Sequence, residues 1–225
     1  MVNYEIDPGL LIPYLPNAVE LDNYHGKTLV SLVGFLFKQT KVFGVKWPLH
    51  TNFEEVNLRF YVKHFDGNKW KRGVVFISEI VPSPIIAIMA NKLYREPYSA
   101  KPMSHDIKVN GDEMAATYNW KHKSKWNSLT VTADTLLHDI KPESEEHFIF
   151  EHYWGYNKYN DKTTIEYGVE HETWQVNKVK SWKLDSDIAG LYGNAFVSAL
   201  SIPPSSVFLA KGSDVLIRKP IFIRK

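Results

Sequence analysis

The chain has 225 residues, 44% of them hydrophobic and 14% aromatic, which is enough to bury a substantial core as one domain over residues 1–225. Charged residues make up 23% and the formal net charge is +2, which excludes a disordered composition and argues against a dedicated nucleic-acid binder. Cysteine is absent, which excludes disulfides, a thiolate nucleophile and a cysteine-based zinc site.

The N-terminal stretch MVNYEIDPGLLIPYLP contains no secretory signal, because it lacks a basic region, an apolar core and a small-residue cleavage site. The apolar run IIAIMA at 85–90 is too short to span a bilayer. We therefore expect a soluble, cytoplasmic protein with no membrane partner. Within the stretch, DPGLLIPYLP predicts a helical turn with Pro8 at its first position.

The first half of the chain predicts long strands joined by short turns. A strand is expected over 27–42, with Gly34 as a bend or bulge, and a second over 53–65. The turn DGNK then leads into a hairpin partner over 72–81. Pro82 and Pro84 open a segment whose apolar residues recur at helical spacing.

The second half of the chain predicts further hairpins and two short helices. Dipeptides such as NG and GD between alternating runs are strong hairpin signals. Strands are expected over 99–109, 113–122, 128–134, 153–159, 163–171 and 175–184, and helices over 143–151 and 187–200, with Asp187 capping the second. This set of strands and helices predicts a mainly β (α+β) fold, an antiparallel barrel with a few flanking short helices. A closed barrel is expected because closure leaves no unpaired strand edges.

Two basic clusters lie between strand-like runs, KWKR at 69–72 and KHKSK at 121–125. Exposed lysines at such positions discourage pairing between sheet edges. We therefore predict that both clusters are solvated hairpin tips.

The stretch FEEVNLRFYVKHF at 53–65 has an apolar face and a polar face, because side chains alternate along a strand. Glu55 and Arg59 on the polar face are about 13 Å apart along the backbone, so each is expected to find its own partner. Arginine matches a carboxylate or phosphate, and asparagine both donates and accepts. Three readings stay open: a solvated face, a buried network that only orders the fold, and the lining of a ligand pocket. The polar face comprises Glu55, Asn57, Arg59, Tyr61 and Lys63.

No motif predicts a metal or cofactor. His147 and His152 are five residues apart, which does not place them on one helix face, and no H-E-x-x-H motif occurs. A P-loop, a dinucleotide fingerprint and a G-x-S-x-G elbow are also missing from the sequence. His171 is the strongest functional histidine, with a structural hydrogen bond beside Trp174 as the equal alternative.

Several segments in order along the chain resemble domain-of-unknown-function family 2071, also called YqjF-like. They are FEEVNLRFYV, GVVFIS, LYREPYSA, EHYWGYN, VEHETW and SVFLAKGSDVLIRKP. That family is similar in turn to the acetoacetate decarboxylase-like superfamily, whose fold is an antiparallel barrel with a cone-like cavity. The resemblance therefore implies that the polar face of 53–65 points into a barrel lumen, with Glu55 as the counterpart of a glutamate that shapes the decarboxylase cavity.

The sequence departs from the decarboxylases at their paired lysines. VEHETW resembles their H-E-A-W segment, and YREPYSAKP resembles the segment in which two lysines follow a proline. In those enzymes the first lysine forms a Schiff base with the keto acid, and its neighbour lowers its pKa. Here Tyr98 and Ser99 follow Pro97, and Lys101 is displaced by two or three positions, which puts imine chemistry in doubt.

The sequence thus predicts a barrel protein that binds a small, acidic organic molecule. Glu55 is the predicted acid or base and Arg59 the predicted anchor for the anion. Two alternatives remain: a lysine-dependent keto-acid decarboxylase using Lys101, and a non-catalytic ligand-binding or structural protein. No cofactor and no metal are expected, and a homo-oligomer is compatible with the sequence. Ligand contacts are expected from Asn57, Tyr61, Tyr98 and His171.

Overall fold

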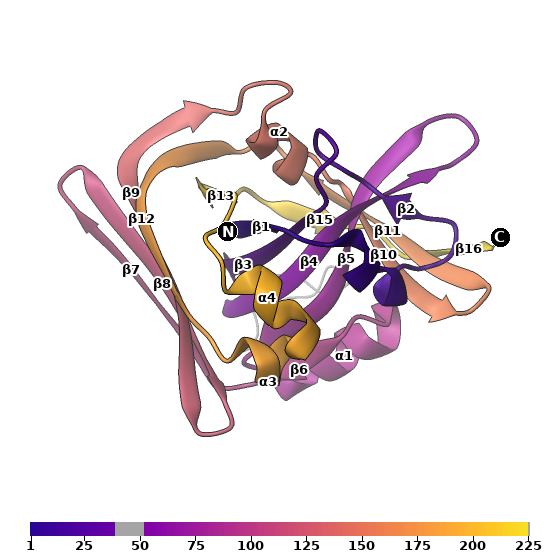
Figure 1. Ribbon diagram of the computed structural model, residues 1–225, viewed down its shortest axis with the longest axis horizontal. Coiled ribbons are helices and arrows are strands. Elements are labelled where there is room, and N and C mark those ends of the chain that lie inside the picture. Colours follow the sequence, from indigo (N-terminus) through magenta and orange to yellow (C-terminus); the bar gives the residue numbers. More distant parts are fainter. Residues whose placement is uncertain (39–51, 225) are drawn as a thin grey trace.

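The computed structural model describes residues 1–38 and 52–224, and consists mostly of β-strands in two sheets (Figure 1). The larger sheet has the strand order β13 (Ser206–Val207), β1 (Val2–Glu5), β3 (Leu29–Phe37), β4 (Phe53–Phe65), β5 (Trp70–Val81), β10 (Trp154–Asn160), β11 (Thr163–His171), β15 (Val215–Ile217). Three further strands extend it: β2 (Glu20–Leu21) pairs with β4, β6 (Tyr98–Ala100) with β5, and β16 (Ile221–Arg224) with β11.

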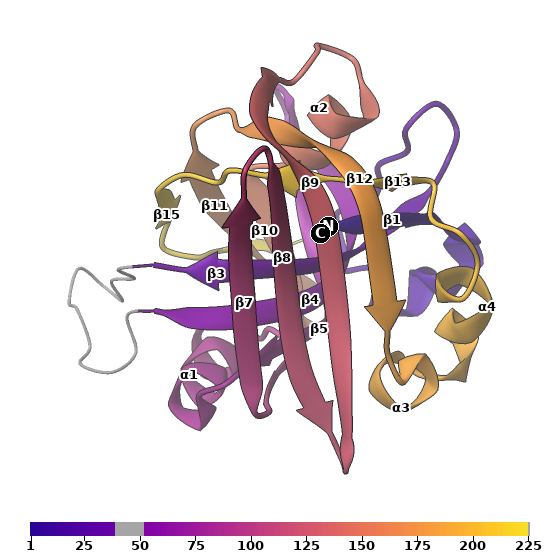
Figure 2. The same ribbon diagram turned by 90° about the vertical axis from the view of Figure 1, so that its left-hand side faces the viewer.

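The smaller sheet has the strand order β14 (Leu209–Ala210), β12 (Gln175–Asp185), β9 (Lys125–Asp139), β8 (Glu113–His122), β7 (Met103–Asn110). Figure 2 shows β7, β8 and β9 in front of β3 and β4 and running across them. In neither sheet do the described strands pair back to the first strand, so the mainly β class is confirmed but a closed barrel is not shown. The helices are α1 (Pro84–Tyr94), α2 (Glu145–Phe150), α3 (Ile188–Tyr192) and α4 (Val197–Leu200), with 3-10 turns at Pro8–Leu10, Ile12–Tyr14 and Asn194–Phe196.

The apolar face of β4 forms the main core with the smaller sheet. Val56, Leu58 and Phe60 are fully buried there. They belong to the same cluster as Trp120 and Leu129 of the smaller sheet. At about 25 cal/mol per Å² of apolar surface, such side chains supply most of the driving force that holds the sheets together.

The polar face of β4 lies on the opposite side and is also covered. At one end Phe53 packs with Ala87 of α1, and at the other the Tyr61 ring lies 5.3 Å from the ring of Phe148 in α2. Glu55, like Tyr61, is only 1% exposed. The solvated-face reading is therefore wrong for the middle of this strand.

The β4–β5 hairpin confirms the predicted pairing and adds a bulge. The register runs antiparallel from Val56 opposite Ile80 to Phe65 opposite Trp70, with a shift between Leu58 and Arg59. A bulge adds one residue to one strand and locally changes which residues face each other.

Three local predictions need correction. The strands β3 and β4 pair without a register shift, so Gly34 makes no bulge; a Cβ there would lie 2.8 Å from the Tyr118 ring, and the glycine permits close approach of the smaller sheet. The predicted helix over 187–200 is broken by Gly193, whose φ is 94°. The predicted strand over 99–109 is split into β6 and β7 at Lys101 and Pro102. Residues 39–42 of the predicted strand 27–42 lie outside the described residues.

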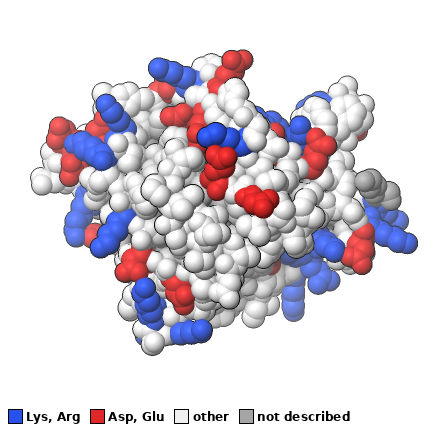
Figure 3. All heavy atoms as spheres, viewed as in Figure 1, with Lys and Arg blue, Asp and Glu red and all other residues white. Residues whose placement is uncertain are grey.

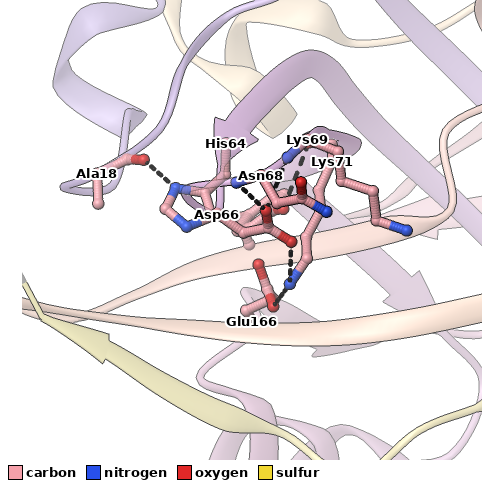
Figure 4. Close-up of polar contacts among 8 residues, drawn as sticks. Ala18, His64, Asp66, Asn68, Lys69, Lys71 and Glu166 are labelled. Atoms are coloured by element: carbon pink, nitrogen blue, oxygen red, sulfur yellow. Dashed lines mark hydrogen bonds and ion pairs between the residues drawn. The ribbon is translucent and has the colours of Figure 1, made fainter.

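The prediction that KWKR at 69–72 is a solvated hairpin tip is wrong for Lys71 (Figure 4). Its Nζ lies 2.8 Å from Oε1 of Glu166 on β11, whose side chain is 0% exposed, and 4.3 Å from the Trp154 ring. Asp66 lies 3.6 Å from the same Nζ, and its carboxylate also accepts the backbone N–H groups of Asn68 and Lys69 in the turn. The hairpin is thus tied to β11 by a largely buried ion pair.

Basic and acidic side chains are interspersed on the face drawn in Figure 3. Among the described residues, no helix combines the length and the apolar character that a membrane span requires.

Candidate acid–base site

The register of three neighbouring strands, β4, β5 and β6, brings polar side chains into one row. Asn57 of β4 is opposite Val33 of β3 and Glu79 of β5, and Glu79 is opposite Tyr98 of β6. Residues directly opposite one another in a sheet place their side chains on the same face. The row therefore gathers an amide, a carboxyl group and a phenol on the covered side of the sheet.

Glu55 is the best-connected acid of this face. Its Oε1 accepts a hydrogen bond from Nδ2 of Asn57 at 2.9 Å, and its Oε2 accepts one from the hydroxyl of Tyr98 at 2.8 Å. Burial raises the pKa of Glu55 to about 7, although these two hydrogen bonds and the charge of Arg59 favour the ionised form. A carboxyl group with such a pKa can take up or release a proton near neutral pH.

Glu96 reaches the face from the end of α1. Arg95 ends that helix in the left-handed conformation, with φ 57°, and turns the chain so that Glu96 becomes buried. The hydroxyl of Tyr167 donates to its Oε1. Burial and the charge of the nearby Glu55 raise the pKa of Glu96 to about 7, although the Tyr167 hydrogen bond favours the ionised form.

Tyr167 reaches Glu96 by crossing Gly155 on the neighbouring strand. Gly155 is directly opposite Tyr167, and a Cβ at that position would lie 2.0 Å from the Tyr167 ring. Any larger residue at this point would push the phenol away from the carboxyl group. Glycine therefore serves close approach here rather than an unusual backbone conformation.

Glu79 interacts electrostatically with both other acids and is 1% exposed. Burial holds the pKa of Glu79 well above its usual value, and the charges of Glu96 and Glu55 add to this effect. Its Oε2 is buried and has no hydrogen-bond partner among the described residues. Like charges so close together cannot all ionise easily, so the cluster holds protons at neutral pH.

Arg59 is the cation whose charge acts on this cluster. It lowers the pKa values of Glu55 and Glu79, yet within the described residues it forms no ion pair with either acid. Its Nε is buried without a hydrogen-bond partner there, and its guanidinium carbon lies 5.9 Å from the centre of the Tyr61 ring. Glu55 thus has partners of its own in Asn57 and Tyr98, whereas the expected partner of Arg59 stays a prediction.

The remaining predicted site residues lie in different surroundings. Tyr98 contacts the cluster, but its hydroxyl is used by Glu55. Tyr61 lies on the same face and shares a 2.6 Å hydrogen bond with Ser31. The His171 ring stacks on the Trp174 ring at 4.4 Å, and its Nδ1 lies within hydrogen-bond distance of the backbone carbonyl of Glu172. These contacts match the structural alternative for this histidine. Among the described residues, no contact joins it to the acid cluster.

Sequence reasoning missed four members of the cluster. Glu79 interrupts the apolar run FISEIV, which was a usable signal, but only the strand register shows that it faces Asn57. The buried position of Glu96 depends on the left-handed conformation of Arg95, which no sequence pattern predicted. The missed residues are Glu79, Glu96, Tyr167 and Asn157 of β10, a buried residue whose side chain lowers the pKa of Glu96.

A second buried network adjoins Tyr61. Nε of Arg72 lies 2.6 Å and Nε2 of His152 lies 3.2 Å from Oδ2 of Asp22. Burial lowers the pKa of His152 to about 4, so the ring is neutral at physiological pH. These groups join β5 and α2 to the β2 region, and the described residues contain no cluster of acids and histidines arranged to hold a metal.

A cleft of about 310 Å³ opens at the ends of β3 and β4. Its lining includes Leu36, Glu54 and His105, and Oε1 of Glu54 lies 2.6 Å from Nδ1 of His105. Leu36 is directly opposite Glu54, and alternation along β4 places both on the side away from Glu55. This cleft is therefore separate from the acid cluster.

The buried carboxyl groups should give the protein an unusual pH dependence of stability. Glu55 and Glu96 have pKa values of about 7 in the folded chain against 4.5 ordinarily, so the folded state retains protons that the unfolded state has released. Stability should then fall as pH rises through this range, by up to about 1.4 kcal/mol per pH unit for each proton retained. His152 has the opposite effect, because its pKa is lowered and the unfolded state binds the proton more readily. This effect makes stability rise with pH, and it is confined to pH values below the ordinary histidine pKa of 6.5.

The measurement is the free energy of denaturant unfolding between about pH 6.5 and pH 8. We expect it to decrease with rising pH in the parent chain and to change less in Glu55→Gln and Glu96→Gln. A flat profile in the parent would show that these carboxyl groups are already ionised in the folded state.

The arrangement defines a mainly β two-sheet protein with a buried acid–base cluster on one strand face. The chain belongs to the DUF2071 family, described as "Uncharacterized conserved protein", whose model matches residues 1–214. A relative is "Uncharacterized protein YqjF" of Bacillus subtilis (strain 168), 24% identical over 220 residues, covering 95% of this chain and 85% of the relative.

Solved structures with a similar fold include enzymes. Acetoacetate decarboxylase from Legionella pneumophila matches with a TM-score of 0.64 and 14% identity over 99% of this chain and 82% of its own. An acetoacetate decarboxylase-like enzyme from Sphingomonas wittichii RW1 gives 0.60 and 12%, covering 99% and 87%. The enduracididine biosynthesis enzyme MppR complexed with pyruvate gives 0.57 and 12%, covering 96% and 86%. At these identities the similarity establishes the fold alone.

Proposed function

We propose that the chain binds a small organic acid at the covered face of β4, with Arg59 as the anchor and Glu55 as general acid or base. The observation that carries the proposal is an arginine with a buried, unpartnered Nε beside carboxyl groups whose pKa values are raised by burial. Perturbed acids next to a specific charge are typical of functional sites. Arg59 and Tyr98 are partly exposed, which gives this face contact with solvent.

The similar structures supply a consistent ligand class. Acetoacetate and pyruvate, named for two of them, are small carboxylic acids. A barrel-like closure of the two sheets, as expected from the sequence, belongs to this proposal, because the site then lies in the interior. Small carboxylates such as butanoate should raise the melting temperature of the parent chain but not of Arg59→Met.

The lysine-dependent alternative has no support from the site. Lys101 lies one residue beyond β6 and three positions from Tyr98. Among the described residues, no hydrogen bond or ion pair joins its side chain to any of the three glutamates. Alternation from Tyr98 places position 101 on the other side. A Schiff-base lysine is activated by desolvation or by a neighbouring cation, and the residues that gather on this face are three acids and an arginine, with no lysine among them.

Incubation with acetoacetate and borohydride should therefore leave the intact mass of the protein unchanged. Borohydride reduces an imine to a stable amine, so a true lysine imine leaves a permanent mass increase. Acetoacetate decarboxylase treated in parallel serves as the positive control. A reduced adduct that maps to Lys101 would show that the lysine enters the site and would restore the decarboxylase alternative.

A further inference from the structure

Two buried oxygen atoms on the covered face of β4 lack a hydrogen-bond partner among the described residues. Oδ1 of Asn57 and Oε2 of Glu79 are both buried and have no hydrogen-bond partner among the described residues, and each residue is 1% exposed. Their strands place the two residues directly opposite one another. A buried acceptor without a partner is costly, so this pair favours a ligand that brings a donor.

The unfilled donor on the same face is Arg59. It lies two residues along β4 from Asn57, and its Cα is about 8 Å from that of Glu79, given a rise of about 3.3 Å per residue and a strand spacing of about 4.8 Å. Arg59, which suits a negative group, and the Asn57–Glu79 pair, which suits a positive group, are thus close enough for one small molecule to contact both.

We propose that the ligand of this site is amphoteric, with a carboxylate on Arg59 and a protonated nitrogen held by Glu79 and Asn57. This inference rests on the proposed function and narrows it from any small acid to a molecule of the amino-acid type. A ligand without an N–H or O–H group, such as a simple carboxylate, leaves both unpartnered oxygen atoms without a donor. A protonated amine supplies up to three donors and a compensating charge.

The proposal predicts an exchange of protons on binding. The charged and titratable groups that act on Glu79 are Glu55 and Arg59 of β4, Tyr98 of β6 and Glu96 after α1. In the empty site burial and the two neighbouring acids raise the pKa of Glu79, which favours its protonated form. An ammonium group favours the carboxylate, so binding releases that proton, and affinity rises by up to about tenfold per pH unit below the pKa. A simple carboxylate should show the opposite trend, because ionised glutamates neutralise Arg59 as pH rises.

The test is calorimetric titration of the parent chain with three matched probes: butanoate, butylammonium and 4-aminobutanoate. At about pH 7 we expect 4-aminobutanoate to bind at least about tenfold more tightly than butanoate, because charged hydrogen bonds to a buried partner have this magnitude. Its affinity should increase between about pH 6 and pH 7 while that of butanoate decreases. Glu79→Gln should remove both the preference and the increase, whereas Glu172→Gln, at an exposed position, should change neither.

The outcomes separate this inference from the proposed function. If butanoate binding depends on Arg59 but 4-aminobutanoate binds no more tightly than butanoate, the proposal of an amphoteric ligand is wrong and the proposed acid-binding site stands. If 4-aminobutanoate binds equally well to Glu79→Gln, Glu79 is not the amine partner. If no probe binds and Arg59→Met changes nothing but stability, both proposals are wrong. Folding of Glu79→Gln is checked by its unfolding transition.

Discussion

Arg59→Met is expected to abolish the stabilisation that small carboxylates give to the protein, with little change in the stability of the empty chain. Methionine keeps an unbranched apolar stem and removes the guanidinium donors. Arg59 makes no ion pair among the described residues, so its loss strands no ionised partner. We expect the free energy of unfolding to stay within about 1 kcal/mol of the parent at about pH 6, where the acids hold their protons. Carboxylate affinity should fall at least about tenfold.

Arg72→Met is the matched control on the adjacent strand. Arg72 donates to the mostly buried Asp22 at 2.6 Å, and hydrogen bonds from His152 and Arg72 outweigh burial and lower the pKa of that acid. Its removal should destabilise the chain and leave carboxylate binding intact. The reverse pattern, in which Arg59→Met unfolds far more easily and no carboxylate stabilises the parent, would assign Arg59 to a structural network.

Lys71→Met is expected to lower the free energy of unfolding by about 3–5 kcal/mol, because it leaves a buried carboxylate without its cation. Glu166 is 0% exposed and its Oε1 lies 2.8 Å from the lysine, so it cannot regain water when the lysine is lost. Chemical denaturation at about pH 7 measures the loss directly. Replacing Glu166 by Met as well should recover most of it, because an apolar pair of similar size is often as stable as a buried ion pair.

Lys125→Met is the control, since Lys125 and Asp185 are also 2.8 Å apart but each side chain is 55% exposed. Exposed pairs are worth at most about 1 kcal/mol. Equal effects of the two lysine replacements would mean that burial does not govern the Lys71 pair.

Much of the fold was predictable because local patterns agree with the structure. The strands Phe53–Phe65 and Thr163–His171 have the bounds predicted from alternation and turn residues, and the Asp187 side chain caps its helix as expected. The errors fall where distant parts of the chain decide the outcome. Gly34 was interpreted as a bulge because its contact with Tyr118 of the other sheet is invisible in the sequence.

The site was predictable only in part for the same reason. Alternation along one strand identified Glu55, Asn57, Arg59 and Tyr61 as a set. Glu79 and Glu96 required the register between strands and a left-handed residue, neither of which single-sequence patterns specify. The sequence identified only one glutamate beside Arg59, so it predicted an acidic ligand. The structure adds two further glutamates, which also favour a ligand with a positive group.

The most direct test of the central claim is carbon NMR titration of the glutamate carboxyl groups, with and without butanoate, assigned by Glu55→Gln, Glu79→Gln and Glu96→Gln. The account predicts that Glu55 and Glu96 titrate near pH 7 in the empty protein, that the pKa of Glu79 lies well above its ordinary value, and that butanoate raises the pKa of Glu55 by occupying Arg59. Ordinary pKa values for all three, unchanged by butanoate, would contradict a ligand-responsive acid–base site.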